Sequence, residues 1–395
     1  MDSQQGKEVV RHKAVSERFT RRDLLKYAAA AGVSVSLLSG STEGAWASTK
    51  SNSGGLQTVR WISPRGTLDV MDDYDLHVPI QMGYFKELGI NVDLIAGPLS
   101  DALATTTFVA QHKADMGYPS TGVLTASLDA GVPVKGICDM AAGQVFDFAL
   151  PPDSKITSVK QLAGKTIALG SAGWSTIVNP ILVEVGVDPK SVKYVEAGSE
   201  WAQVTARSEA DAALTWEGLR AQWLAEGLKL KYLLGTTFSN QPSNVYAVRT
   251  VDLKDPAKVD LYTRFLQGVV MGLVFAQTNP RAAAQITYGV LPKLRQTLKP
   301  EAAYLSFLEL RHMYGLAHGA GKPWGWSFPG AWNSYLQIVY KLGQTKRLWP
   351  AADVVTNALV VPANRKANVA KAVADAKAFK LNNIWQAMNP APKTY

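Results

Sequence analysis

Residues 159–198, VKQLAGKTIALGSAGWSTIVNPILVEVGVDPKSVKYVEAG, and residues 206–216, ARSEADAALTW, decide the fold of this chain. Together they predict an α/β lobe with a polar Gly-Ser turn at the end of one strand and a later strand that ends in Trp216 and Glu217. An edge of this kind is suited to holding a small molecule. Nothing in the two stretches requires chemistry on that molecule.

Strands and helices alternate on the N-terminal side of these stretches. The pattern predicts strands at 58–63, 91–95, 115–118 and 132–139, and helices at 77–88, 101–112 and 121–130. A turn-rich segment, 64–75, follows the first strand. The second run of strands is predicted at 166–169, 191–196, 212–215 and 231–234. This spacing favours a mostly parallel sheet covered by helices on both faces.

Two extended segments, 146–150 and 245–249, bracket the second run, and the chain is mostly helical from 256 to 343. This is the pattern expected when one lobe is inserted into another through a two-strand hinge. Within the inserted lobe, Pro180 predicts either a kink in the helix after the Gly-Ser turn or a helix start nearer Asn179.

The N-terminus predicts an exported protein. Residues 20–26, TRRDLLK, form a twin-arginine motif, and an apolar stretch at 27–38 follows that is too short to span a bilayer. Ala45-Trp46-Ala47 offers the small residues that a signal peptidase requires, so cleavage is expected after Ala47. We therefore expect folding in the cytoplasm, export by the twin-arginine machinery and residence in the periplasm.

Composition argues against several kinds of site. The net charge of +9 is mild for 395 residues, and the Arg21-Arg22 pair serves as an address, so no nucleic-acid partner is expected. Cys138 is the only cysteine, which rules out an internal disulfide and a metal site built from several thiolates. The five histidines have no recognised metal spacing, so neither a metal nor another cofactor is expected.

Four segments resemble a known family: GYFKELGINVDLIAG (83–97), QHKADMGYPSTGVLTASLDAGVPVKGI (111–137), ITSVKQLAGKTIALG (156–170) and SEADAALTWEG (208–218). In this order along the chain they are similar to periplasmic substrate-binding proteins of SsuA/TauA and thiamine-pyrimidine type, which serve ABC importers. The resemblance covers about residues 58–343. It implies a type II periplasmic binding fold, in which two α/β lobes joined by a two-strand hinge close on a ligand.

The resemblance and the strand pattern together divide the chain into five parts. These are a signal peptide at 1–47, a flexible leader at 48–55, a discontinuous first lobe at 56–145 and 249–345, an inserted second lobe at 146–248, and a C-terminal extension at 346–395 that packs on the first lobe. A monomer is expected, with a small-molecule ligand and an ABC permease in the inner membrane as partners.

Ligands of parallel sheets bind beyond the carboxyl ends of the strands. Applied to both lobes, this rule selects the following ligand-binding residues: Ser63, Arg65, Gly66, Tyr118, Ser120, Thr121, Ser171, Gly173, Trp174, Ser175, Trp216 and Glu217.

Arg65 and the Gly-Ser turn point to an anionic ligand, because a guanidinium and the free N–H groups of a helix start both bind anions. The alternatives are that Arg65 faces solvent and that Ser175 only caps a helix. Trp174 and Trp216 would wall the body of the ligand, or pack in the core. Trp324 and Trp326 are as well explained by a loop that packs on the C-terminal helices.

Acidic residues after the first strand offer an argument for the opposite charge on the ligand. Asp69, Asp72, Asp73 and Asp75 follow the first strand, and acidic residues in such a segment are ordinarily solvated. If several face the cleft beside Tyr74, the ligand would instead be cationic or amine-bearing. Glu217 would accept a hydrogen bond from the ligand or pair with an arginine.

We therefore predict a protein that captures a small organic ligand, preferably an anion such as a sulfonate or aromatic carboxylate, without catalysis. A pyrimidine or amine ligand, an exported enzyme and a sensor receptor are the alternatives. The chain has no GxSxG motif, no P-loop and no GxGxxG after a strand. Pyrimidine synthases that share the fold carry a cysteine-rich iron motif, and this chain has only Cys138.

Overall fold

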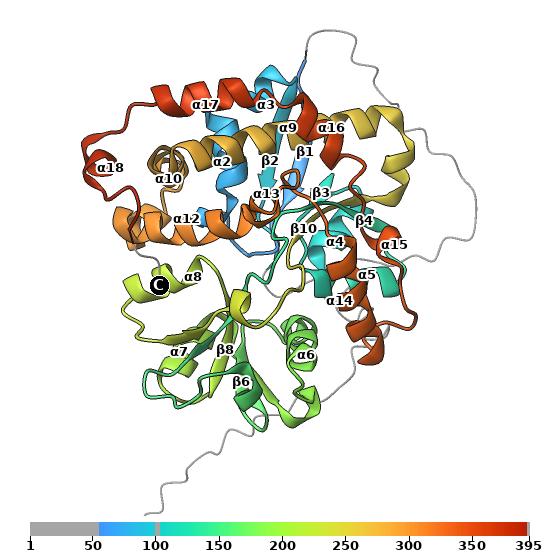
Figure 1. The fold of residues 1–395 in the computed structure, drawn as a ribbon, viewed down its shortest axis with the longest axis vertical. Helices are drawn as coiled ribbons and strands as arrows, with labels where there is room; N and C mark the ends of the chain where they lie inside the picture. The colour runs from blue at the N-terminus through green and yellow to red at the C-terminus, as the bar shows by residue number, and fades with distance from the viewer. Residues whose placement is uncertain (1–54, 99–102, 393–395) are drawn as a thin grey trace, which may run out of the picture.

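The computed structural model describes residues 55–98 and 103–392, which form two α/β lobes (Figure 1). Each lobe is built on a five-stranded sheet. The signal peptide predicted at 1–47 lies outside the described residues, and so does the predicted leader at 48–55 except for its last residue.

The first sheet has the strand order β2-β1-β3-β10-β4. Its strands are β1 (Gln57–Ile62), β2 (Ile90–Ile95), β3 (Met116–Gly117), β4 (Val134–Asp139) and β10 (Val245–Arg249). Strand β1 pairs in parallel with β2 and β3, while β10 runs antiparallel to β3 and β4. Strand β10 therefore returns to the first sheet from a distant part of the chain.

The second sheet has the order β7-β6-β8-β5-β9. Its strands are β5 (Phe146–Leu150), β6 (Thr166–Leu169), β7 (Lys193–Glu196), β8 (Ala212–Trp216) and β9 (Lys231–Leu233). Strand β6 pairs in parallel with β7 and β8, and β5 runs antiparallel to β8 and β9. The predicted alternation is thus present, with one antiparallel crossing strand added to each sheet.

The two segments that connect the lobes lie side by side. Met140 donates its backbone N–H to the carbonyl oxygen of Asn244 at 3.0 Å, and Ser243 donates to the carbonyl of Ala141 at 3.0 Å. The Ser243 hydroxyl also accepts the backbone N–H of Val145 at 2.7 Å. These bonds make a paired two-segment hinge between β4 and β5 on one side and before β10 on the other.

Helices cover both sheets and form the C-terminal part. They are α2 (Tyr74–Gln81), α3 (Tyr84–Glu87), α4 (Ala104–Ala110), α5 (Thr121–Asp129), α6 (Ser175–Glu184), α7 (Trp201–Ala206), α8 (Leu219–Ala225), α9 (Pro256–Thr278), α10 (Pro280–Gly289), α11 (Leu294–Thr297), α12 (Pro300–Tyr314), α13 (Leu316–Gly319), α14 (Pro329–Lys341), α15 (Ala351–Val354), α16 (Val360–Lys366), α17 (Val369–Ala378) and α18 (Asn383–Ala387). Short 3-10 turns are η1 (Met71–Asp73), η2 (Val159–Leu162), η3 (Ala172–Trp174), η4 (Pro189–Ser191), η5 (Gly198–Glu200), η6 (Gly235–Thr237) and η7 (Thr250–Lys254).

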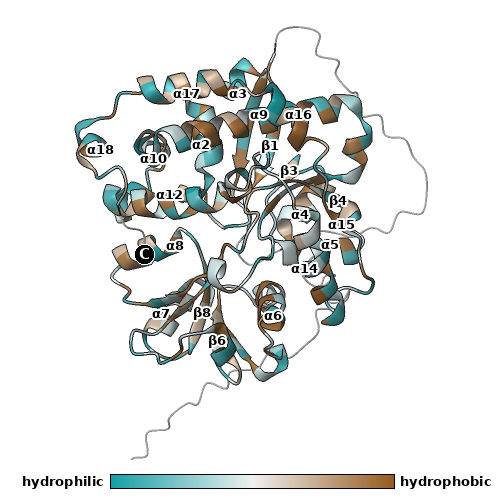
Figure 2. Cartoon of the chain, in the orientation of Figure 1, coloured by the Kyte–Doolittle hydropathy of each residue, from teal (hydrophilic) through white to brown (hydrophobic). Residues whose placement is uncertain are grey.

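Helix α9 is the central helix of the first lobe. It begins at Pro256, after Asp255 accepts the backbone N–H of Ala257 with its side chain. Among the described helices, α9 alone is long and apolar enough to cross a membrane by composition, but 83% of its apolar window is buried within the protein. Helices α2, α16 and α17 pack against it (Figure 1), so it is a core helix. Figure 2 shows further hydrophobic residues on α6 and near β4.

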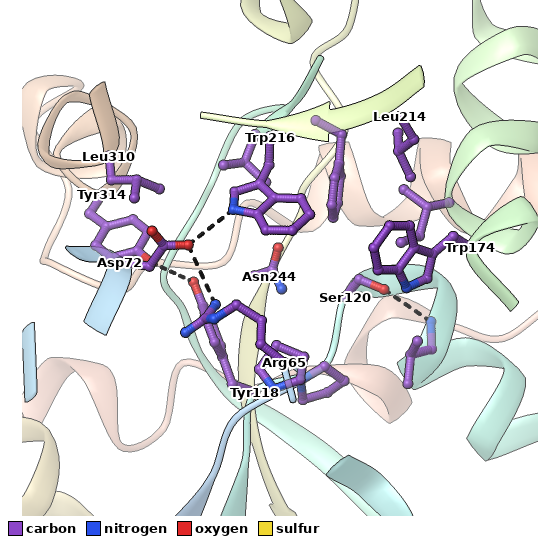
Figure 3. A pocket seen from close by; sticks show the side chains of 16 residues that line it. Arg65, Asp72, Tyr118, Ser120, Trp174, Leu214, Trp216, Asn244, Leu310 and Tyr314 are labelled. Carbon is purple, nitrogen blue, oxygen red and sulfur yellow. Dashed lines mark hydrogen bonds and ion pairs between the residues drawn. The ribbon is translucent and has the colours of Figure 1, made fainter. Parts of the chain in front are cut away.

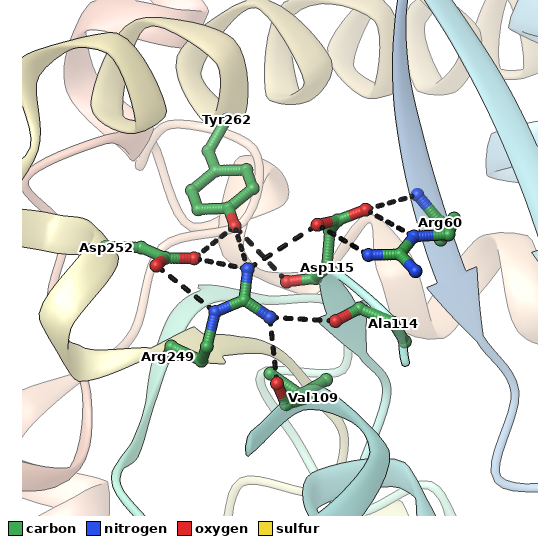
Figure 4. Close-up of polar contacts among 7 residues, drawn as sticks. All are labelled: Arg60, Val109, Ala114, Asp115, Arg249, Asp252 and Tyr262. Carbon is green, nitrogen blue, oxygen red and sulfur yellow. Dashed lines mark hydrogen bonds and ion pairs between the residues drawn. The ribbon is translucent and has the colours of Figure 1, made fainter. Parts of the chain in front are cut away.

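A buried polar network holds the end of the crossing strand β10 (Figure 4). Arg249 donates to the carbonyl oxygens of Val109 at 2.8 Å and Ala114 at 2.9 Å. Its Nη2 lies 2.7 Å from Oδ2 of Asp252 and 3.4 Å from Oδ1 of Asp115. One guanidinium therefore satisfies two carbonyl groups in and after α4, one carboxylate before β3 and one in η7, which fixes β10 to its surroundings in the first lobe.

Replacing Arg249 by lysine is expected to destabilise the protein by about 1–3 kcal/mol, because an ammonium group cannot reach all of these acceptors and leaves some unsatisfied. Chemical denaturation measures this change. Arg207→Lys is the control, since Arg207 pairs with Glu209 on the exposed surface and its replacement should leave the unfolding midpoint unchanged. Equal midpoints for both variants would contradict the role given to Arg249.

The helix expected at 101–112 is the shorter α4 (Ala104–Ala110), and two other helices also differ from the prediction. The helix expected at 77–88 is divided into α2 and α3, because Gly83 adopts a left-handed backbone with φ of 76°. Helix α6 begins at Ser175 and contains Pro180, so the predicted start nearer Asn179 is wrong. The η3 turn before it, closed by a bond from the backbone N–H of Trp174 to the carbonyl of Ser171, starts the helix early.

Candidate functional site

A cavity partly open to solvent, with about 80 Å³ available to the centres of water-sized molecules, lies between the two lobes (Figure 3). Both lobes and the hinge contribute to its walls. The lining residues are Pro64, Arg65, Asp72, Tyr118, Pro119, Ser120, Val123, Val145, Phe146, Trp174, Ile177, Leu214, Trp216, Asn244, Leu310 and Tyr314. Most of this surface is aromatic or aliphatic, and the charged groups are gathered at one end (Figure 3).

Arg65 and two aspartates form the charged end. The loop after β1 carries Arg65 and is held by a bond from the Arg65 backbone N–H to the Ser63 hydroxyl at 3.1 Å. The guanidinium hydrogen-bonds to Asp73 through Nη2, and its Nη1 lies 3.6 Å from Oδ2 of Asp72. Both aspartates come from η1. The arginine therefore already has anionic partners within the protein.

Asp72 also connects the lobes. Trp216, at the end of β8 in the second lobe, donates its indole N–H to Oδ2 of Asp72 at 3.0 Å (Figure 3). Burial raises the pKa of Asp72 to about 6, and the nearby Arg65 offsets only part of that effect. Oδ1 of Asp72 and Nε of Arg65 are buried without a hydrogen-bond partner. The charged end thus contains one acceptor on a carboxyl group and one donor on a guanidinium that make no hydrogen bond within the protein.

Two tyrosines stand beside Asp72. The hydroxyls of Tyr118, after β3, and Tyr314, at the end of α12, are 2.9 Å apart. Burial raises the pKa of both phenols well above the ordinary value. They remain neutral hydrogen-bonding groups at neutral pH, and their rings add flat apolar surface to the wall.

Tryptophans of the second lobe form another wall of the cavity. The rings of Trp174 and Trp216 meet edge to face with centroids 6.0 Å apart, and Trp201 stacks on Trp216 behind them. Trp174 lies against Gly170, where a Cβ atom would come within 2.7 Å of the indole ring. The glycine of the Gly-Ser turn is therefore required by the tryptophan that reaches the cavity.

Five of the residues predicted for ligand binding line this cavity: Arg65, Tyr118, Ser120, Trp174 and Trp216. The other seven do not line it: Ser63, Gly66, Thr121, Ser171, Gly173, Ser175 and Glu217. Trp324 and Trp326 are also outside the lining. Contact of any of these residues with a ligand remains a prediction.

The Gly-Ser turn closes on itself. The hydroxyl of Ser175 donates to the carbonyl of Ala172 at 2.9 Å, and that of Thr176 donates to the carbonyl of Gly173 at 2.8 Å. These hydroxyls therefore shape the start of α6. Ser120 similarly caps α5 by accepting the backbone N–H of Val123 at 3.4 Å, although it also lines the cavity.

Glu217 takes the arginine-paired alternative. Its Oε2 lies 2.6 Å from Nη2 of Arg220, and the Arg220 guanidinium also faces Asp147 at 3.3 Å and Glu309 at 3.4 Å. Burial raises the pKa of Glu217 to about 8 and the pKa values of Asp147 and Glu309 to about 7. Because Glu309 belongs to α12 of the first lobe, this group is a second charged link between the lobes.

The acidic segment after β1 is not solvated, contrary to the ordinary expectation. Asp72, Asp73 and Asp75 are at most 2% exposed. Asp75 accepts a hydrogen bond from the Tyr246 hydroxyl, and burial raises its pKa to about 8. Of the three, only Asp72 lines the cavity.

Sequence reasoning missed much of the apolar lining and the contribution of α12. Leu310 and Tyr314 lie in a long helix with no strand end nearby, so the strand-end rule does not select them. Asn244 and Val145 come from the hinge. The hinge was predicted from two extended segments, 146–150 and 245–249. Val145 and Asn244 each directly precede one of these segments, and this adjacency is the signal that could have found them.

Comparisons with known proteins give a family and a fold. A family model described as NMT1/THI5 like matches residues 75–283. No curated protein matched the chain. Among solved structures, the alkanesulfonate-binding protein SsuA from Xanthomonas axonopodis pv. citri, bound to MOPS, has 11% identity and a TM-score of 0.57, and the alignment covers 76% of this chain and 99% of that one.

Two further structures widen the comparison. The periplasmic aliphatic sulphonate binding protein SsuA from Escherichia coli has 12% identity and a TM-score of 0.56 over 76% of this chain and 92% of that one. A DszB mutant in complex with biphenyl-2-sulfinic acid has 13% identity and a TM-score of 0.52 over 78% and 99%. The predicted periplasmic binding fold is thereby confirmed.

Proposed function

Because this chain belongs to the NMT1/THI5-like family, we propose that it is an extracytoplasmic solute-binding protein that captures a small organic molecule and delivers it to an ABC importer. The observation that carries the proposal is a cavity with walls from both lobes and from the hinge between them. A ligand placed there would contact both lobes at once and would favour the closed arrangement.

Closure would occur by rotation about the paired hinge segments. Direct contacts between the lobes are made by α5 with α6 and by α12 with α8. A ligand that bridges the lobes would stabilise these contacts, and the closed outer surface would be the feature that a membrane permease recognises. We further propose a monomer that reaches the periplasm through the twin-arginine pathway.

The partners of Arg65 bear on the class of ligand that the cavity would bind. An organic anion was expected from a free Arg65, but the structure pairs this guanidinium with Asp73 and places it near Asp72. A sulfonate or carboxylate at the charged end would therefore meet carboxylates together with the arginine. The aromatic walls support a flat apolar body in any case.

An exported enzyme is the competing function, and the DszB mutant in complex with biphenyl-2-sulfinic acid has a similar fold. The described cavity lining contains Asp72 with a pKa of about 6, which is a value suited to proton transfer. Incubation of the purified protein with each candidate ligand, followed by mass spectrometry of the ligand, separates capture from conversion. Stoichiometric release of an unchanged molecule supports capture.

A ligand present at a hundred times its dissociation constant is expected to stabilise the protein by about 2.7 kcal/mol, which raises its melting temperature. A thermal screen of sulfonates, aromatic carboxylates, pyrimidines and amines measures this. Trp174→Ala should lose the shift because Trp174 walls the cavity, whereas Trp326→Ala, outside the lining, should keep it. Turnover of the ligand, or a shift unaffected by Trp174→Ala, would contradict the proposal.

A further inference from the structure

The charged end of the cavity carries more negative than positive groups. Arg65 is the only lysine or arginine among the lining residues, and it faces the two buried carboxyl groups of Asp72 and Asp73. Arg65 donates a hydrogen bond to Asp73, but its nearest nitrogen is 3.6 Å from Asp72, beyond hydrogen-bond distance. The positive charge is therefore committed to Asp73 more than to Asp72.

Asp72 is poorly supplied with donors for a buried carboxylate. It is 2% exposed, its Oδ2 accepts one bond from the Trp216 indole, and its Oδ1 has no partner. An ionised carboxylate has about four acceptor positions. Burial keeps its pKa near 6, which shows that the surrounding protein stabilises its charged form incompletely.

The walls next to Asp72 are aromatic faces and edges. Trp216, Tyr118 and Tyr314 surround the carboxyl group, and Trp174 extends the surface toward α6 (Figure 3). Aromatic faces attract cations as well as flat apolar groups. A carboxylate that lacks donors, inside an aromatic wall whose one lining arginine already hydrogen-bonds to Asp73, is suited to a positively charged planar group.

We propose that Asp72 is the specificity-determining residue of the cavity and that it selects a planar organic cation, such as an amidinium or a protonated heterocyclic amine, over organic anions of the same shape. This inference rests on the proposed binding function. The cation donates an N–H bond to the Asp72 carboxylate and places its flat body between the tryptophans and tyrosines. Arg65 holds Asp73 and shapes the loop, and it is not the receptor for a ligand anion.

Three probes of nearly equal shape test the choice of charge: benzamidine as the cation, benzamide as the neutral molecule and benzoate as the anion. Titration calorimetry at pH 7.5, supported by quenching of tryptophan fluorescence, gives the affinities. We expect benzamidine to bind roughly tenfold or more tightly than either of the others: benzamide can also donate an N–H hydrogen bond to the carboxylate, but only the cation adds an opposite charge, and benzoate is repelled.

Asp72→Asn keeps the shape of the side chain and removes its charge. It should weaken benzamidine roughly 10- to 100-fold and leave benzamide nearly unchanged. Asp69→Asn is the matched control, because Asp69 lies in the same segment but outside the cavity lining. Retention of the cation preference by Asp72→Asn would overturn the inference, and so would tighter binding of benzoate by the wild type.

The wild-type protein offers a second test that needs no variant. Lowering the pH from 7.5 to 5 protonates Asp72 through its pKa of about 6, so benzamidine affinity should fall while benzamide affinity holds. The titratable groups that interact with Asp72 are Arg65, Asp73 and Tyr314, whereas Asp75 and His77 of α2 act on Asp73 and Arg65. A benzamidine affinity that is independent of pH would contradict the role of Asp72.

The outcomes separate this inference from the proposed function. If a sulfonate or carboxylate binds unchanged in the wider screen and benzamidine does not, the protein is still a solute-binding protein and the assignment of Asp72 is wrong. If every molecule that binds is converted, the binding function itself fails. A cation preference that disappears in Asp72→Asn supports both.

Discussion

Replacing Arg220 by methionine is expected to lower the free energy of unfolding by about 3–5 kcal/mol at pH 8, because it removes one partner of a buried ionic group and leaves the others uncompensated. Arg220 is 3% exposed, and its guanidinium faces Asp147, Glu217 and Glu309. Glu309 also accepts the backbone N–H of Gly218 at 3.0 Å. Loss of Arg220 should therefore also loosen α12 from the second lobe.

The cost should depend on pH. Burial raises the pKa values of the three carboxyl groups to about 7 or 8, above their usual values, so the folded protein binds their protons more tightly than the unfolded chain. The stability that this tighter proton binding contributes is present in full below the pKa values that the carboxyl groups have in the unfolded chain. It is lost as the pH rises through 7 to 8. Arg220 offsets that loss because its charge stabilises the ionised carboxylates. At pH 5 these carboxyl groups are protonated, so Arg220→Met should lower the free energy of unfolding by less than it does at pH 8.

Urea denaturation at pH 5 and pH 8 measures both effects. Arg207→Met is the control, because Arg207 makes an exposed pair with Glu209 and its loss should leave the midpoint unchanged at either pH. An Arg220→Met variant that is as stable as the wild type at pH 8, or equally destabilised at both pH values, would show that the group is not the buried interlobe link described above.

Replacing Gly122 by valine is expected to weaken ligand binding roughly 5- to 150-fold while leaving each lobe folded. A Cβ atom at Gly122, in α5 of the first lobe, would lie 2.8 Å from the carbonyl oxygen of Thr176 in α6 of the second. Overpacking of this kind costs about 1–3 kcal/mol. The clash exists only when the lobes approach, so its cost reduces the population of the binding-competent state.

Gly330→Val is a closely matched control. Gly330 is the second residue of α14, as Gly122 is of α5, but nothing lies within 4 Å of a Cβ atom placed there. Calorimetry with any ligand from the thermal screen gives the affinities, and small-angle scattering reports whether the valine holds the lobes apart. Unchanged affinity and dimensions in Gly122→Val would mean that closure does not require the α5–α6 contact.

Much of the fold followed from local pattern. The apolar runs and glycine stops predicted β1, β2 and β6 to within a residue or two, and the two extended segments at 146–150 and 245–249 are the crossing strands β5 and β10. Such features are set by side-chain periodicity and turn chemistry over a few residues. The division of the expected helix at 77–88 required the left-handed conformation of Gly83, which periodicity alone does not indicate.

The candidate site was predictable only in part. The strand-end rule selected Tyr118, Trp174 and Trp216, because a side chain at the end of a strand stays near that edge of the sheet whatever else surrounds it. It also selected Ser175 and Glu217, which have hydrogen-bonding partners inside the protein. A hydroxyl or carboxylate at a strand end can turn either way, and the available partner decides.

The sequence by itself determined the alternating α/β architecture, the inserted second lobe and the family resemblance, since these depend on short-range patterns in order along the chain. The tertiary structure alone decided which charges are free. Asp72 meets the indole of Trp216 at a sequence separation of 144, and Glu309 reaches Arg220 at a separation of 89. Burial and pairing depend on such distant neighbours, so a segment of acidic residues that looked solvated became the charged end of the cavity.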